Sequence, residues 1–214
     1  MPSIAVKICG LSTEPTLDAA LDAGADLVGF VHFAKSPRHV SLERAGVLSR
    51  RAQGRAQRVV LLVDPNDALV TAAVVAIGLD MIQLHGQESP ERVAEIRRLS
   101  GLPVMKAIGV ATSADLAQVR AYAAFADRIL LDAKPPKDAA LPGGNGQSFD
   151  WGLITPGTLP DGWMLSGGLT PDTVADALMR TGATAVDVSS GVEVRPGQKD
   201  PAAIAAFIEA VRSR

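Results

Sequence analysis

The sequence predicts an α/β protein with a single domain, residues 1–214, folded as an eight-stranded (β/α)8 or TIM barrel. Eight short apolar runs, each typical of a buried strand, alternate with segments of helical periodicity or a helical turn. Hydrophobic residues make up 47% of the chain and aromatic residues only 4%, which suits an interior of branched aliphatic side chains. No Gly-rich dinucleotide-binding pattern follows the first run, so the closed barrel is favoured over a doubly wound open sheet.

The first half of the chain contains four strand–helix units. Their strands are expected at residues 4–9, 26–33, 58–63 and 80–84. The N-caps of the helices that follow are expected at Thr13, Ser41, Asn66 and Ser89. Proline follows closely in the first and fourth of these helices, where its missing N–H costs nothing. Gly24 is expected to end the first helix.

The second half completes the count of eight. Its strands are expected at residues 104–108, 128–131, 163–165 and 185–188. Helices are expected at 113–125, 171–180 and 200–211, with only a short helical turn at 149–153 after the sixth strand. The Pro- and Gly-rich segment 133–147 is the one long connection, and such loops are often lids over active sites.

Composition excludes several classes of function. The formal net charge is −2, so the chain lacks the basic surface that nucleic-acid binding requires. A single cysteine, Cys9, excludes an internal disulfide and a multi-cysteine metal site, and it suggests a reducing compartment. The longest apolar stretch, 68–79, is too short to cross a membrane, and the N-terminus has no signal-peptide pattern. The protein is therefore expected to be soluble and cytoplasmic, with no nucleic-acid or membrane partner.

Two late strand ends predict a phosphate site. The segments Leu165–Leu169 and Ala185–Gly191 each run from a buried strand into glycine and serine, which leave backbone N–H groups uncovered. In a β/α barrel, phosphate commonly binds in the loops after strands seven and eight. The candidate phosphate-binding residues are Gly167, Gly168, Ser189, Ser190 and Gly191.

Reactive side chains stand at other strand ends, which form the active face of a barrel. Strand one ends in Cys9, where a thiolate can be both exposed and electrostatically tuned, although a free cysteine is more often a small core residue. Strand six ends at Asp132, which is either a cap or a general acid–base group. Arg38 is either a surface turn residue or a two-pronged partner for a carboxylate.

Other polar residues have less specific patterns. His85 is a candidate substrate-binding residue, although a lone histidine at a strand end is more often a structural hydrogen-bonding group. Asp187 points opposite to its apolar neighbours, into the barrel or its mouth, and Lys7 is expected to pair with such an acid. His85 and Asp187 could in principle share a metal. Because the histidines do not have zinc-ligand spacing, no metal site is predicted.

Six sequence blocks in register resemble the phosphoribosylanthranilate isomerase family. They are Val6–Gly10; Val28–Val31 with Lys35–Arg38; Gln83–Gly86; Asp132 with Gly143–Gly144 and Phe149–Trp151; Leu165–Leu169; and Val186–Glu193 with Pro196–Gly197 and Lys199–Asp200. One glycine pair would be weak, but six ordered blocks from strand one to the last helix are specific. Two positions depart from the family pattern: His32 stands in place of an aromatic residue and Asn145 in place of a threonine.

The resemblance implies a function. Members of this family are β/α barrels of tryptophan biosynthesis that use no cofactor. They convert N-(5-phosphoribosyl)anthranilate into 1-(2-carboxyphenylamino)-1-deoxyribulose 5-phosphate by an Amadori rearrangement. Carried over to this chain, Cys9 is the general base, Asp132 the general acid and Arg38 the ligand of the anthranilate carboxylate. The acid must start protonated and the base deprotonated, so their surroundings must raise the pKa of Asp132 and lower the pKa of Cys9.

Three alternatives remain at this point. A metal-dependent phosphosugar epimerase needs two histidines and two acids around a metal, of which only His85 and Asp187 are candidates. The enzyme that closes the indole ring needs a catalytic lysine and glutamates at strand ends, which are not grouped here. A non-catalytic phosphosugar-binding protein would need no reactive side chains at positions 9, 38 and 132. The sequence leaves open whether the chain is a monomer or a homodimer, whether it accepts a second aminoaldose, and whether loop 10–13 or loop 133–147 moves.

Overall fold

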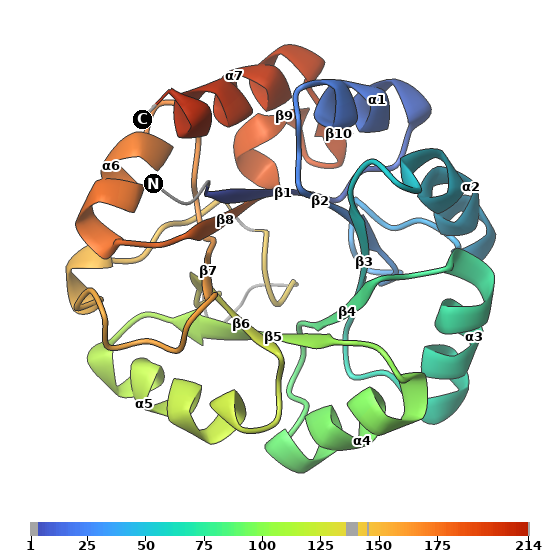
Figure 1. Cartoon of the computed structure of the whole chain (residues 1–214), viewed down its shortest axis with the longest axis horizontal. Coiled ribbons are helices and arrows are strands. Elements are labelled where there is room, and N and C mark those ends of the chain that lie inside the picture. Colours follow the sequence, from blue (N-terminus) through green and yellow to red (C-terminus); the bar gives the residue numbers. More distant parts are fainter. Residues whose placement is uncertain (1–3, 136–140, 145, 214) are drawn as a thin grey trace.

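Eight parallel strands form a closed barrel surrounded by helices in the computed structural model, which describes residues 4–135, 141–144 and 146–213 (Figure 1). The strands are β1 (Ala5–Cys9), β2 (Leu27–Val31), β3 (Gln57–Leu62), β4 (Met81–Leu84), β5 (Val104–Val110), β6 (Arg128–Ala133), β7 (Met164–Leu165) and β8 (Ala185–Val188). Each strand pairs with the next, and β1 closes the ring against β8. The predicted barrel is therefore confirmed.

The helices follow the strands in alternation. They are α1 (Glu14–Asp22), α2 (Leu42–Ala52), α3 (Asp67–Ile77), α4 (Pro90–Ser100), α5 (Ser113–Ala123), α6 (Val174–Thr181) and α7 (Pro201–Arg212). As expected, only a 3-10 turn, η1 (Trp151–Leu153), follows β6 within the described residues. None of the described helices has the length and apolar character that crossing a membrane requires.

The predicted N-caps explain where three of these helices begin. The side chains of Ser41, Asn66 and Ser89 accept hydrogen bonds from backbone N–H groups in the first turns of α2, α3 and α4. Thr13 is the N-cap of α1, but its hydroxyl contacts the Thr16 hydroxyl at 2.8 Å and makes no cap bond. The helix boundaries differ mainly at α6, which begins at Val174 and not at residue 171.

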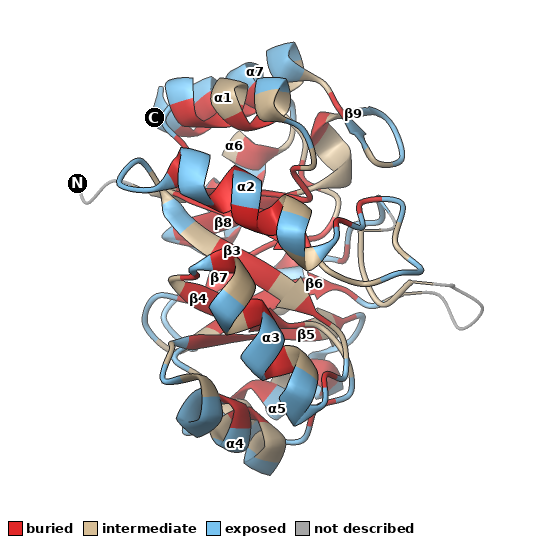
Figure 2. Cartoon of the chain, turned by 90° about the vertical axis from the view of Figure 1, so that its right-hand side faces the viewer, coloured by how far each residue is buried: buried red, intermediate tan, exposed pale blue. Residues whose placement is uncertain are grey.

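Two separate apolar cores stabilise the barrel. Outward-facing strand residues pack against the helices, whose outer faces are exposed (Figure 2). Inward-facing residues form a smaller core inside the ring: Leu27, Val59, Met81, Met105, Ala107, Leu130, Met164 and Ala185. Because side chains alternate along a strand, the residue two positions further along also points into the ring. Several of these residues are polar. These include Lys7, Gln83, Asp132, Ser166 and Asp187, all buried near the carboxyl ends of the strands.

A short hairpin after β8 was not predicted. It consists of β9 (Glu193–Arg195) and β10 (Gln198–Lys199), joined by a turn in which Gly197 has φ +83°. A side chain on Gly197 would collide with the backbone of Pro37, so the hairpin packs directly on the segment that carries Arg38. The hairpin thus brings Glu193 and Lys199 to the carboxyl end of the barrel.

Candidate active site

A cavity opens at the carboxyl ends of the strands, where a barrel is expected to carry its active site. The described residues that line it include most of the candidates from the sequence: Cys9, Arg38, His85, Asp132, Gly167, Gly168, Asp187, Ser189 and Ser190. Gly191 does not line the cavity. A Cβ there would collide with the Leu169 carbonyl, so this glycine permits close packing between the loops after β7 and β8.

Cys9 ends β1 and is buried, with 3% of its surface exposed. Of the two alternatives, the thiol is buried and not exposed to solvent, although Cys9 still lines the cavity. A Cβ on Gly29 of β2 would lie 2.9 Å from the Cys9 sulfur and 3.1 Å from Lys7 Nζ, so both atoms share the space that this glycine leaves. Burial raises the pKa of the Cys9 thiol, whereas Lys7 acts in the opposite direction.

Lys7 and Asp187 form the expected ion pair inside the barrel, with Nζ 2.8 Å from Oδ1. Ser166 on the loop side of β7 donates a hydrogen bond of 3.1 Å to the other carboxylate oxygen. Burial opposes the charge on Lys7, but Asp187 and Cys9 together raise its pKa above the ordinary value, so Lys7 stays protonated. Both oxygens of Asp187 accept a hydrogen bond and the residue lines the cavity, so its predicted substrate contact stays a prediction.

Arg38 is held by a residue that the sequence analysis missed. Its Nε and Nη2 donate to the two carboxylate oxygens of Glu193 at 2.7 and 2.8 Å, and Nη2 also donates to the Gly144 carbonyl at 3.2 Å. The two-pronged pair expected for Arg38 thus exists within the protein. The third guanidinium nitrogen, Nη1, faces the cavity beside Gly144, where a Cβ would lie 2.6 Å away.

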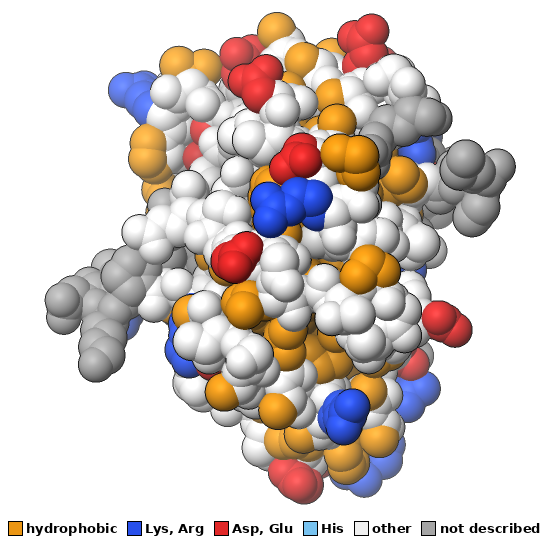
Figure 3. Space-filling model, turned by 90° about the vertical axis from the view of Figure 1, so that its left-hand side faces the viewer, with side chains coloured by type: hydrophobic (Ala, Val, Ile, Leu, Met, Phe, Trp, Pro, Cys, Tyr) orange, Lys and Arg blue, Asp and Glu red, His pale blue; other side chains and the backbone are white. Residues whose placement is uncertain are grey.

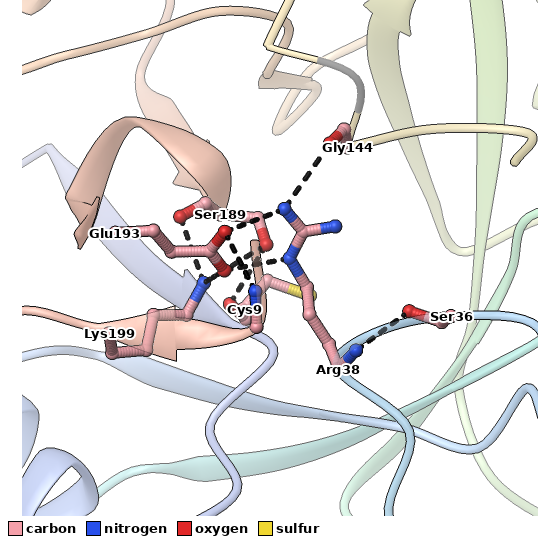
Figure 4. A network of polar contacts seen from close by, with 8 residues as sticks. Cys9, Ser36, Arg38, Gly144, Ser189, Glu193 and Lys199 are labelled. Atoms are coloured by element: carbon pink, nitrogen blue, oxygen red, sulfur yellow. Dashed lines mark hydrogen bonds and ion pairs between the residues drawn. The ribbon is translucent and has the colours of Figure 1, made fainter. Parts of the chain in front are cut away.

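Glu193 lies between Arg38 and Lys199, with Cys9 beside them (Figure 4). Lys199 Nζ contacts Glu193 Oε1 at 2.6 Å, the Ser189 carbonyl at 2.8 Å and the Ser189 hydroxyl at 3.1 Å. Although burial raises the pKa of Glu193, Arg38 and Lys199 hold it below the ordinary value. Ser189 Oγ donates to the Cys9 carbonyl, so its hydroxyl serves this network and only its backbone is left for a phosphate.

Asp132 lies at the end of β6, as expected, one residue before the last residue of the strand. Its Oδ1 accepts from the Ala133 N–H at 2.8 Å, and Oδ2 lies 3.3 Å from His85 Nε2. Gln83 Nε2 lies 3.1 Å from His85 Nδ1 and, as the donor, leaves the ring proton on Nε2, toward Asp132. The Gln83 carbonyl oxygen is buried and has no hydrogen-bond partner among the described residues. His85 therefore contacts the candidate acid.

Gly143 and Gly144 bring the long loop onto these side chains. A Cβ on Gly143 would collide with His85 Nε2 and lie 2.7 Å from Asp132 Oδ2, so only glycine fits there. Residues 136–140 and Asn145, which belong to the predicted lid 133–147, lie outside the described residues. Movement of this loop and the effect of Asn145 stay predictions.

The loop after β7 contributes two glycines to the lining of the cavity. Gly167 and Gly168 have φ +86° and +65°, a conformation that glycine adopts without strain. Neither N–H donates a hydrogen bond to a described residue, and both residues line the cavity. A Cβ on either would lie 2.7–2.8 Å from neighbouring backbone atoms. The arrangement suits a bound anion, and no described group of three or more His, Cys, Asp or Glu residues could hold a metal ion.

Comparison with known proteins identifies the family. The family model of N-(5'-phosphoribosyl)anthranilate (PRA) isomerase matches residues 6–210. The chain belongs to this family. The N-(5'-phosphoribosyl)anthranilate isomerase of Azorhizobium caulinodans is 61% identical over 214 residues, which cover 99% of this chain and 92% of the relative. That of Rhodopseudomonas palustris is 57% identical over 211 residues and covers 99% of this chain and 97% of the relative.

Solved structures of the family share the fold. The phosphoribosyl anthranilate isomerase of Thermotoga maritima matches with a TM-score of 0.87 at 35% identity, covering 99% of this chain and 100% of that chain. A phosphoribosyl anthranilate isomerase in complex with reduced 1-(o-carboxyphenylamino)-1-deoxyribulose 5-phosphate matches with a TM-score of 0.83 at 32% identity and the same coverage. The resemblance found in the sequence is confirmed.

Membership of this family gives the reaction. The chain isomerises N-(5'-phosphoribosyl)anthranilate to 1-(2-carboxyphenylamino)-1-deoxyribulose 5-phosphate in tryptophan biosynthesis. The epimerase, the indole-closing enzyme and the non-catalytic binding protein are thereby set aside.

Proposed function

We propose that Cys9 is the general base and Asp132 the general acid of this isomerisation, and that the reaction uses neither a metal nor a cofactor. The observation that carries the proposal is that both side chains line one cavity, from strands β1 and β6 that are not neighbours in the ring. A substrate between them can receive a proton on one side and lose a proton on the other.

The chemistry follows from this placement. Asp132 protonates the ring oxygen of the aminoaldose, and the C1–O bond breaks to give an iminium ion. The positive charge acidifies the hydrogen on C2, which the Cys9 thiolate removes to form an enolamine. Tautomerisation to the ketone completes the rearrangement.

Arg38 provides the contact for the anthranilate carboxylate in this proposal. Glu193 occupies Nε and Nη2, so the guanidinium is fixed in orientation and presents Nη1 to the cavity. A guanidinium N–H and a carboxylate form a short charge-assisted hydrogen bond. The geometry supports a single-pronged contact at Nη1.

The phosphate occupies the other end of the substrate. The free N–H groups of Gly167 and Gly168 and the cavity-lining Ser190 support a phosphate site in the loops after β7 and β8. His85 acts through Asp132, and Asp187 acts through Lys7, so neither contacts the substrate in this scheme.

The remaining expectations concern the whole chain. We propose one domain over residues 1–214, since β1, near the start of the described chain, pairs with β8 to close the barrel, and a cytoplasmic location. A phosphoribosylanthranilate isomerase from Thermotoga maritima is dimeric. On the face of this chain shown in Figure 3, acidic and basic groups interrupt the hydrophobic side chains. Light scattering will decide between the monomer and the homodimer.

A continuous fluorescence assay of phosphoribosylanthranilate loss tests the acid–base assignment. Wild-type turnover should survive exhaustive chelation, whereas Cys9→Ser and Asp132→Asn should each lower kcat by about 10²- to 10⁴-fold. Near-normal turnover of either variant would remove that residue from the mechanism, and loss of wild-type activity on chelation would show a metal requirement.

A further inference from the structure

Among the residues that the structure describes, five buried charged side chains form a connected group beside Cys9 (Figure 4). Three are cations: Lys7, Arg38 and Lys199, which are 0%, 5% and 4% exposed. Two are carboxylates: Asp187 is 5% exposed, and the side chain of Glu193 is 3% exposed. We refer to these five residues as the charged cluster. Beyond the charged cluster, the titratable groups lining the cavity are Asp132 on β6, His85 after β4 and Lys134 after β6. Lys134 pairs with Asp115 at 2.6 Å.

The charges of the cluster do not balance while the thiol is neutral. Lys199 Nζ has three acceptors, which matches the three protons of an ammonium ion and not the two of an amine. Lys7 is held protonated by Asp187, and an arginine does not lose its proton in proteins. Glu193 is shared by Arg38 and Lys199, so three cations face two carboxylates and the cluster carries a net positive charge, which is unfavourable at low dielectric.

A Cys9 thiolate would supply the missing negative charge. The sulfur and Lys7 Nζ both lie against the backbone of Gly29, at 2.9 and 3.1 Å from the position that a Cβ would take. The two atoms are therefore close neighbours inside the barrel. Lys199 approaches the same residue from the other side, through the Ser189 hydroxyl that donates to the Cys9 carbonyl.

We infer that the charged cluster keeps Cys9 in the thiolate form in the free protein, with Lys7 as the positioning residue beside the sulfur. The inference rests on the proposed role of Cys9 as general base and explains how a buried thiol starts the reaction deprotonated. Burial raises the pKa of the Cys9 thiol and lowers that of Lys199, so the inference requires the net positive charge of the cluster to exceed both effects of burial. The competing source of negative charge is the carboxylate of the substrate at Arg38, and in that case the thiol of the free protein stays neutral.

The ultraviolet absorbance of the thiolate, measured against pH without substrate or phosphate, separates these possibilities. Cys9 is the only cysteine in the sequence, so the difference between wild type and Cys9→Ser reports this thiol alone. The wild-type midpoint should lie below the ordinary thiol value of about 8.5. A midpoint at or above that value would overturn the inference.

Charge variants should move the midpoint in opposite directions. Lys7→Met removes a cation and should raise it by about one pH unit or more, whereas the near-isosteric Asp187→Asn removes an anion and should lower it. Lys106→Met is the matched control, because Lys106 is equally buried and pairs with Glu88 at 2.6 Å on the outer side of β5, so the midpoint should not change. A general loss of packing would not give shifts of opposite sign.

The outcomes remain separable from the base assignment. If Lys7→Met fails to fold, two other variants still test both directions. Lys199→Met should raise the midpoint of the thiolate titration, and Asp187→Asn should lower it. Shifts in the same direction, or an equal shift in Lys106→Met, would overturn the inference. An inactive Cys9→Ser together with an ordinary wild-type midpoint would overturn the inference but leave Cys9 as the general base. An active Cys9→Ser would show that Cys9 is not the general base.

Discussion

Arg38 shows how a contact distant in sequence determines what a functional side chain can do. Its partner Glu193 is 155 residues away in the chain, and their pair uses two of the three guanidinium nitrogens. Because Glu193 also binds Lys199, one carboxylate fixes two cations beside Cys9. We expect such a residue to control substrate affinity without contacting the substrate.

Glu193→Gln should therefore weaken substrate binding. The amide keeps the size of the side chain but lacks the charge that orients Arg38, so KM for phosphoribosylanthranilate should rise about tenfold, equivalent to ~1.4 kcal/mol. Steady-state kinetics measures the change, with Glu209→Gln on the exposed side of α7 as the control. An unchanged KM would mean that Arg38 is oriented by its other contacts.

Gly143 is a second position where a single added carbon atom should lower activity. Alanine there would push against His85 and Asp132, and a displacement of about 1 Å at a catalytic group can cost about 10²-fold. Gly143→Ala should lower kcat/KM by that order while the circular dichroism spectrum stays unchanged. Wild-type kcat/KM would show that the loop moves away from these side chains.

Much of the site could be predicted from the sequence because reactive residue types follow buried strand patterns. Cys9, Asp132 and the two glycine-containing loops fall in this group, and all of them reach the carboxyl end of the barrel. The partners that set their properties could not be found this way. Glu193 and Lys199 act through contacts with distant segments, whereas Gln83 contacts His85 two residues along the chain. These residues stand in the blocks that carry the family resemblance, but no local pattern reveals their contacts, and the hairpin with the Pro196–Gly197 turn was not predicted.

Helix starts were predictable for a related reason, since a cap is a local hydrogen bond. The N-terminus of α5 has a capping box in which Asp115 accepts from the N–H groups of Ala111 and Thr112 at 3.0 and 2.9 Å. Lys134 also pairs with Asp115 at 2.6 Å, which connects α5 to the segment after β6. The Lys134 hydrogen bond, followed by the backbone hydrogen bonds, lowers the pKa of Asp115 well below its ordinary value.

Asp115→Asn should therefore destabilise the protein in a pH-dependent way. Since the folded-state pKa is depressed, this contribution is full above the unfolded value near 3.9 and is lost as pH falls toward the folded value. At neutral pH we expect a loss of about 1–2 kcal/mol in urea unfolding, which should shrink on acidification. Asp176→Asn, in the exposed first turn of α6, is the control. A pH-independent difference would contradict the linkage.

The whole barrel depends on two cores, and the smaller one lies inside the ring. Leu130 is fully buried there, directly in line with Asp132 on β6. Leu130→Ala should cost about 2–5 kcal/mol, because the ring of strands cannot collapse onto the cavity. Leu99→Ala, at a position 45% exposed on α4, should change the free energy of unfolding by less than about 0.5 kcal/mol. Equal losses would show that the inner core contributes little.

The assignment of Cys9 as general base and Asp132 as general acid is tested most directly with substrate deuterated at C2. In Cys9→Ser, removal of the C2 hydrogen becomes the slow step, so deuterium should clearly slow the residual turnover. In Asp132→Asn, ring opening becomes the slow step, so deuterium should have no effect. An isotope effect in Asp132→Asn and none in Cys9→Ser would reverse the two roles, and equal effects would contradict the assignment of separate steps.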